Sequence, residues 1–244
     1  MCVFHGVLLC SDEVWGDVAL TPDSHPFVSM LALLASPSDE LPAGAAATAA
    51  ERAMATDDTE AARGVPGLLH LLMVLTSPSK CFNVAPLDLA VAIVPDDALR
   101  ARFRRCGADS AEVSVFGYMA AMAAYGDPEC EAWRLRLIEY LRANRDHAAA
   151  ALQGMGIRCV VPEASYLMWM DASDALPDGV IAEDFFLDAG VGLSGGLPFG
   201  GSSGTVRLNI GCRREVLDEG LTRMAAAIDA ARDTRTAAGK RQRS

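Results

Sequence analysis

Three short apolar runs in the N-terminal part of the sequence each end at polar or acidic residues, and this pattern limits the fold more than any other feature. The runs cover residues 7–11, 69–75 and 89–94. A continuous apolar run of about four to eight residues is typical of a strand that is covered on both faces of a parallel sheet. We therefore expect an α/β fold whose strands carry polar side chains at their carboxyl ends, where open sheets of this class bind ligands.

After the third run, the apolar spacing becomes helical, beginning with Leu99, Phe103 and Cys106 on one helical face. Longer helices are expected at residues 111–125 and 129–152. A mixture of short elements follows, with strands at 157–161, 166–170, 190–193 and 206–210 and helices at 181–189 and 215–231. The order predicts a part with parallel strands and helices, followed by a smaller α+β part.

The overall composition indicates which binding partners and which cellular compartment are expected. The net charge of -11 and the isoelectric point near 4.8 argue against nucleic acid and anionic membranes as partners. We find no signal-peptide pattern and no apolar run of membrane-spanning length, so we expect a soluble cytoplasmic protein. The 7 cysteines form no CxxC pair and have no ligand spacing with the 4 histidines, so we expect reduced thiols and no metal site.

Lys80 stands directly after the second predicted strand, in a loop that also contains Ser77, Pro78 and Ser79. A desolvated lysine at a strand's carboxyl end has an amine available to form a Schiff base with an aldehyde. Nearby hydroxyl and loop N–H groups are suited to hold a phosphate. The alternative is a solvated lysine in a polar turn, and the spacing alone does not separate the two interpretations.

Two further charged residues occur in apolar surroundings. Asp12 ends the first predicted strand, where its carboxylate is suited either to keep a heterocyclic nitrogen protonated or to cap a following helix. Arg207 lies inside the apolar strand 206–210 and needs a partner, which is either a substrate carboxylate or a structural ion pair. We find no glycine-rich phosphate loop of the nucleotide-binding type, and the glycine-rich segment 195–201 instead sits before the strand that carries Arg207, which disfavours a nucleotide-binding domain.

Together, four separated motifs resemble the class I/II aminotransferase family of fold-type-I pyridoxal-5'-phosphate (PLP) enzymes. They are residues 11–17 (SDEVWGD), 77–83 (SPSKCFN), 162–171 (PEASYLMWMD) and 206–209 (VRLN). The residues of these motifs are similar to those of the cystathionine β-lyase-like, or carbon–sulfur lyase, branch. The resemblance implies the aspartate aminotransferase-like fold, with a mostly parallel sheet in a partial large domain and a smaller α+β C-terminal domain.

The resemblance also implies a role for each matching residue. Lys80 would bind PLP covalently and later move the proton of the substrate's Cα. Asp12 would pair with the pyridinium nitrogen, and Ser77, helped by Ser79, would bind the cofactor phosphate. Trp15 stands where relatives have a tyrosine or histidine that hydrogen-bonds the ring oxygen, and an indole donates only through its N–H.

For the substrate, the resemblance implies that Arg207 holds the α-carboxylate of a small or sulfur-containing amino acid. Both carbon–sulfur β-lyase and aminotransferase activity are compatible with these residues. Family members are homodimers with active sites at the subunit interface, so a homodimer is also implied.

The beginning of the chain matches the middle of the large domain in full-length relatives, so we expect an N-terminally truncated member of the family. The alternative function is that of a catalytically inactive homologue that acts by protein–protein interaction. The implied division is a partial PLP-binding large domain at 1–127 with a low-complexity insertion at about 35–67, a connecting helix at 128–154, a small domain at 155–232, and a disordered tail at 233–244.

Overall fold

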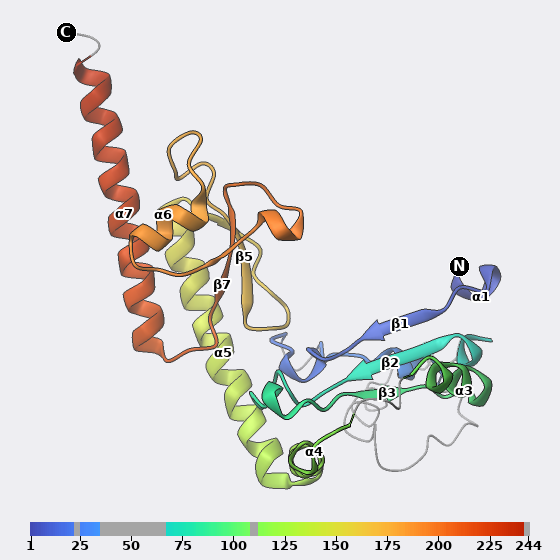
Figure 1. The fold of residues 1–244 in the computed structure, drawn as a ribbon. Helices are drawn as coiled ribbons and strands as arrows, with labels where there is room; N and C mark the ends of the chain where they lie inside the picture. Colours follow the sequence, from blue (N-terminus) through green and yellow to red (C-terminus); the bar gives the residue numbers. More distant parts are fainter. Residues whose placement is uncertain (22–24, 35–66, 108–111, 242–244) are drawn as a thin grey trace. The chain divides into compact units, whose positions relative to one another are not determined.

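The computed structural model describes residues 1–21, 25–34, 67–107 and 112–241, and the chain divides into two compact units (Figure 1). The units are Met1–Arg136 and Leu137–Ser244, so the boundary falls within one long helix, α5 (Pro128–Met155). The low-complexity insertion predicted at about 35–67 lies outside the described residues, except for Gly67.

The first unit contains a small sheet, helices and several 3-10 turns. Its elements are α1 (Cys2–His5), β1 (Leu9–Asp12), η1 (Gly16–Val18), η2 (Met30–Leu34), η3 (Leu68–His70), β2 (Leu72–Thr76), η4 (Ala85–Leu87), β3 (Val91–Ile93), α3 (Asp97–Arg105), α4 (Val115–Gly126) and the start of α5. Leu68, Leu72 and Val74 form the core of this unit together with Leu31. All three predicted strands of this part are present, with bounds that differ by a few residues.

The strands of this sheet are ordered β1-β2-β3 (Figure 1). β1 and β2 are parallel, with Leu9 opposite Leu72, as the sequence predicts. β3 is antiparallel to β2, although its apolar run is of the kind expected for a parallel strand. The connection from β2 to β3, residues 77–90, contains only turns and η4, and it lacks the crossover helix that usually joins parallel strands.

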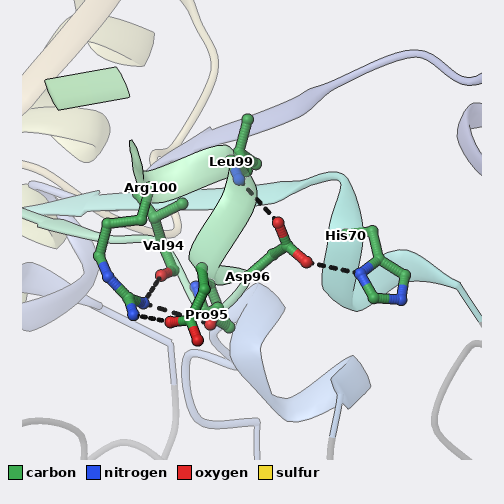
Figure 2. A network of polar contacts seen from close by, with 7 residues as sticks. His70, Val94, Pro95, Asp96, Leu99 and Arg100 are labelled. Atoms are coloured by element: carbon green, nitrogen blue, oxygen red, sulfur yellow. Dashed lines mark hydrogen bonds and ion pairs between the residues drawn. The ribbon is translucent and has the colours of Figure 1, made fainter. Parts of the chain in front are cut away.

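Helix α3 begins at a well-defined cap, which Figure 2 shows. The Leu99 N–H donates to Asp96 Oδ1 at 2.7 Å, and the His70 ring nitrogen Nδ1 lies 2.6 Å from Asp96 Oδ2. Arg100 donates to the Val94 carbonyl at 2.6 Å. These contacts join η3, the end of β3 and the first turn of α3, and they place charged groups where the helix leaves its first N–H groups unpaired.

The second unit is an antiparallel sheet packed against helices. Its elements are the C-terminal part of α5, β4 (Arg158–Cys159), β5 (Leu167–Asp171), α6 (Ala182–Asp188), β6 (Ser194–Gly195), η6 (Leu197–Phe199), β7 (Thr205–Asn209) and α7 (Arg214–Arg241). The strand order is β4-β5-β7-β6. Alternate residues of β5 and β7 are buried with one side of each helix, including Met168, Met170, Val206, Leu152, Phe186 and Met224.

Two elements of this unit differ from their prediction. Residues 190–193 do not form a strand, because Gly190 adopts a left-handed conformation (φ 77°) and the Val191 N–H closes back onto the Phe186 carbonyl, which ends α6. Helix α7 continues to Arg241, so the segment predicted as a disordered tail is helical through residue 241. Its arginine, alanine and lysine residues have high helix propensity.

Buried polar contacts fix α5 against the end of β7. Asn144 is fully buried, and its Nδ2 donates to the carbonyls of Ile210 at 2.9 Å and Cys212 at 3.0 Å. The Tyr140 hydroxyl accepts from the Arg214 N–H at 2.7 Å, at the start of α7. Among the described residues, no helix combines the length and apolarity that a membrane span requires.

Candidate active site

The carboxyl ends of β1 and β2 bring two of the predicted motifs together. Because the strands are parallel, Asp12 lies opposite Leu75, and the Glu13 N–H donates to the Leu75 carbonyl at 2.8 Å. The loops that follow therefore leave the same edge of the sheet. Lys80 Nζ lies over the indole of Trp15, 5.9 Å from the ring centroid, and both side chains are half-buried. This distance is within the range of a cation–π contact.

Lys80 is presented by a compact loop that its own hydrogen bonds hold in shape. The Phe82 N–H donates to the Pro78 carbonyl at 3.0 Å, and the Val84 N–H donates to the Ser79 carbonyl at 3.2 Å. Asn83 completes the turn in the left-handed region, with φ 55°. Within the described part of the chain, the Lys80 ammonium makes no hydrogen bond or ion pair. Among the described residues, the contact with Trp15 is therefore the one interaction shown for this ammonium.

The two serines of this loop have different surroundings. Ser77 is buried, its hydroxyl donates to the Leu89 carbonyl at 2.7 Å, and it accepts from the Ser79 N–H at 3.1 Å. The Ser79 hydroxyl is half-buried and makes no hydrogen bond to the described residues. Ser77 thus joins β2 to the segment before β3, whereas Ser79 has a hydroxyl that is available to a ligand.

The acidic residues at the end of β1, Asp12 and Glu13, differ in whether the fold uses their carboxylates. Asp12 is exposed, and from the described residues its Oδ1 accepts only a turn-forming hydrogen bond, from the Val14 N–H at 3.2 Å. Glu13 is buried, and its Oε1 accepts from the Ser11 hydroxyl at 3.0 Å and from the Met30 N–H at 2.8 Å. Asp12 is therefore the acid of this motif with a carboxylate left for a ligand.

Arg207 lies in the second unit, on the face of β7 that points away from the helices. Trp169 is opposite Arg207 on β5, and Ser194 is opposite it on β6. Its guanidinium carbon lies 4.8 Å from the ring centroid of Phe199. No carboxylate of the described residues pairs with Arg207, so the structural ion pair considered from the sequence is not found there. Its donors are left for an anion such as a carboxylate.

Comparison with known proteins places this chain in a family. The profile of the family described as aminotransferase class I and II matches residues 2–224. This chain belongs to that family. The cystathionine beta-lyase PatB of Bacillus subtilis strain 168 is 31% identical to it over 239 residues, which cover 93% of this chain and 51% of PatB.

Solved structures with a similar fold support the same family assignment. The structure named OvoB is 34% identical, with a TM-score of 0.69, over 93% of this chain and 51% of that chain. The PLP-bound C-S lyase from Staphylococcus hominis shares the fold, with a TM-score of 0.66 at 24% identity, over 93% of this chain and 51% of that one. The chain spans about half the length of the relatives it matches. The predicted family and its aspartate aminotransferase-like α/β fold are confirmed.

A polar group of residues near the Lys80 loop was missed by the sequence analysis. Arg134 is buried, holds Glu131 through two hydrogen bonds of 2.6 and 2.7 Å, and donates to the Asp17 carbonyl at 3.1 Å. The pair with Glu131 raises the pKa of Arg134, and with Tyr125 these residues line a pocket of about 190 Å³. The spacing of Glu131 and Arg134 on one helix is the only sequence signal for this contact.

Two titratable groups near this pocket stay protonated at neutral pH. Burial raises the pKa of the Cys81 thiol to about 12, although Cys81 follows Lys80 directly. Burial also raises the pKa of the Tyr125 phenol to about 12, and a hydrogen bond with Thr76 lowers it by a smaller amount. The residue as a whole is 40% exposed. Because the thiolate is the nucleophilic form of cysteine, Cys81 is unsuited to nucleophilic catalysis beside Lys80.

Proposed function

We propose that this chain acts in a PLP-dependent enzyme of amino-acid metabolism, with carbon–sulfur β-lysis as its reaction and amino transfer as the alternative within the same family. The observation that carries the proposal is the position of Lys80. Its amine is presented by a rigid loop at the carboxyl edge of the β1–β2 pair, beside Trp15. The similarity to PatB, a cystathionine beta-lyase, favours the lyase reaction over amino transfer.

The residues at this edge of the sheet fit the cofactor by their chemistry. Lys80 provides an amine that forms no ion pair with the described residues, and Trp15 provides an aromatic face. Asp12 provides an exposed carboxylate, and Ser79 provides a hydroxyl that makes no hydrogen bond within the described part of the chain. These groups match the aldehyde, the ring, the pyridine nitrogen and the phosphate of PLP. Ser77 fits less well as a phosphate donor, since its proton is already used at the Leu89 carbonyl.

PLP, when bound, supplies an aldehyde that takes the substrate amine and a ring that withdraws electrons from Cα. The Lys80 amine is proposed to attach the cofactor and, once displaced by substrate, to take the proton from Cα. In a lyase this proton transfer is followed by loss of the sulfur substituent from Cβ, whereas an aminotransferase returns the proton elsewhere. Asp12 is proposed to hold the proton on the pyridine nitrogen, and Ser79, with Ser77, to bind the phosphate.

Arg207 is proposed to bind the α-carboxylate of a small or sulfur-containing amino acid. A guanidinium binds a carboxylate through two parallel N–H···O bonds, which fixes the orientation of the bonds at Cα. The guanidinium supports this role, because it forms no ion pair with a carboxylate of the described residues and has one long hydrogen bond, to the Ser194 hydroxyl.

We further propose the domain division 1–127, 128–154 and 155–232 for the PLP-binding part, the connecting helix and the small domain. A homodimer is proposed on the resemblance to the family. Apolar side chains of α4 support it, since Phe116 is 75% exposed and Met122 is 69% exposed. Apolar exposure of this extent along one helix is typical of an interface.

An absorbance titration with PLP tests the proposed function. The chain has two lysines, Lys80 and Lys240, so Lys240→Ala is a matched control for Lys80→Ala. We expect a visible absorbance band for the wild-type chain and for Lys240→Ala, and none for Lys80→Ala. L-cystathionine is then added to the loaded chain, and thiol release against amino transfer to a keto acid identifies the reaction. An identical spectrum for all three proteins would contradict the proposal.

The second candidate is a catalytically inactive protein that acts by protein–protein interaction. The exposed apolar side chains of α4 favour it, because they are also suited to bind a different protein. A properly folded chain that shows no Lys80-dependent band would support this candidate instead.

A further inference from the structure

Arg207 is held in an unusual way for an arginine in a sheet. Its only hydrogen bond to the described residues runs from Nη2 to the Ser194 hydroxyl at 3.4 Å, which is long for an N–H···O bond. A side chain with several rotatable bonds needs more than this contact to keep one orientation. Another neighbour must therefore fix the guanidinium.

That neighbour is Phe199, the last residue of η6. The guanidinium carbon of Arg207 lies 4.8 Å from its ring centroid, well inside the range of a cation–π contact. The same ring meets the Trp169 ring edge to face, with centroids 6.0 Å apart and planes at 89°. A guanidinium that lies over an aromatic face is fixed without using its N–H donors, which point outward in the guanidinium plane.

The loop that carries Phe199 is closely packed around its glycines. The Gly196 N–H donates to the Thr205 carbonyl at 2.8 Å, and the Gly201 N–H donates to the Gly196 carbonyl at 3.0 Å. A Cβ on Gly196 would overlap the Thr205 hydroxyl, and a Cβ on Gly201 would lie 2.9 Å from the Trp169 ring. This part of the loop therefore has little freedom to move Phe199 away from Arg207.

We propose that Phe199 is a positioning residue that orients the Arg207 guanidinium for the substrate carboxylate while leaving its donors free. The inference rests on the proposed role of Arg207 and adds a residue that the family motifs did not indicate. A carboxylate and an amide are distinguished at this position, because an amide does not accept the paired, charge-assisted hydrogen bonds.

The test compares the binding of L-alanine and L-alaninamide to the PLP-loaded chain by calorimetry. Phe199→Leu keeps an apolar side chain but removes the aromatic face, and Phe199→Tyr restores the face. Leu197→Ala is the matched control, since Leu197 lies in the same 3-10 helix and is 58% exposed, against 57% for Phe199. Arg207→Ala reports separately on the proposed function.

We expect Phe199→Leu to weaken L-alanine binding about five-fold, which at 1.4 kcal/mol per factor of ten equals roughly 1 kcal/mol. L-alaninamide binding should stay unchanged, and Phe199→Tyr and Leu197→Ala should bind L-alanine like the wild type. Wild-type affinity in Phe199→Leu, or an equal loss for both ligands, would overturn the positioning role. If Arg207→Ala also binds L-alanine normally, the carboxylate role of Arg207 itself is wrong.

A measurement without an amino-acid ligand tests the contact between Phe199 and Arg207 directly. The aromatic face of Phe199 should shift the proton resonances of the Arg207 guanidinium and δ-methylene upfield in the NMR spectrum of the full chain. The shift should vanish in Phe199→Leu, persist in Phe199→Tyr and be unaffected by Leu197→Ala. Equal shifts in the wild type and Phe199→Leu would overturn the inference, whether or not an amino acid binds.

Discussion

Ser77 and Ser79 carry the same hydroxyl group two residues apart, but only that of Ser77 is built into the fold. We expect Ser77→Ala to lower the free energy of unfolding by roughly 1–3 kcal/mol, because the Leu89 carbonyl and the Ser79 N–H would lose a buried partner. Ser79→Ala should change it by less than about 0.5 kcal/mol. Urea unfolding of both variants measures the difference.

The same two variants separate stability from cofactor binding. PLP affinity should fall in Ser79→Ala, because the variant lacks the Ser79 hydroxyl, which makes no hydrogen bond to the described residues and is available to a phosphate. A large loss of stability in Ser79→Ala with none in Ser77→Ala would show that the two hydroxyl groups have been assigned in the wrong order.

At the residue scale, the sequence identified charged groups but not their partners. It indicated Lys80 and Asp12 because a polar residue directly after an apolar strand is visible in the pattern. It did not show that Glu13, rather than Asp12, is buried, because that depends on the Met30 N–H of a distant segment. Phe199 was missed for the same reason, since its contact with Arg207 is made by the folded glycine-rich loop.

At the scale of elements, the cap of α3 is expected to depend on pH. Hydrogen bonds from the His70 ring and the Leu99 N–H lower the pKa of the Asp96 carboxyl below its usual range. Because the folded-state pKa is lowered, the stabilisation is present above the unfolded pKa and is lost as the pH falls through the folded one. The melting temperature of the wild-type chain should therefore fall between about pH 5 and about pH 2.

Asp96→Asn is the control for this pH dependence, because its side-chain oxygen still caps the helix but does not titrate. The difference in melting temperature between the wild type and Asp96→Asn should be present above about pH 5 and should shrink as the pH falls below it. A difference that stays constant, or grows in acid, would show that the Asp96 carboxylate is not the titrating group.

The attachment of α5 to β7 depends on one buried amide. Asn144→Leu keeps a similar volume but leaves the Ile210 and Cys212 carbonyls without their donor. We expect a loss of roughly 1–3 kcal/mol in the free energy of unfolding, measured by urea denaturation. Glu139→Leu, at an exposed position of the same helix, should have little effect, and equal losses in both variants would argue against this role of Asn144.

Which elements form was easier to predict than how they pair. The apolar runs and the helical spacing located most strands and helices, because these periods are local properties of the chain. The antiparallel direction of β3 was not predicted, since the pattern of a short apolar run is the same in either direction. The extension of α7 through residue 241 was also missed, because residues 233–241 lack the apolar spacing that indicates a helix and only their helix propensity favours one.

At the scale of the whole molecule, α4 is expected to control self-association. If a second copy covers this helix, the double variant Met119→Gln/Met122→Gln should weaken the dimer at least ten-fold, since burying one methionine side chain contributes roughly 1.5 kcal/mol. Sedimentation equilibrium of the variant and of Leu187→Gln, an exposed apolar residue on α6, provides the comparison. A wild-type chain that stays monomeric, or equal effects of both changes, would contradict a dimer through α4.

The central claim is that Lys80 is the residue that binds PLP, and the chain allows a direct measurement because Lys240 is its only other lysine. The full-length chain is mixed with PLP, reduced with borohydride, digested and analysed by mass spectrometry. We predict that the phosphopyridoxyl group is found on the peptide that contains Lys80, with Lys240 largely unmodified. Labelling of Lys240 or the N-terminal amine in preference to Lys80 would contradict the claim.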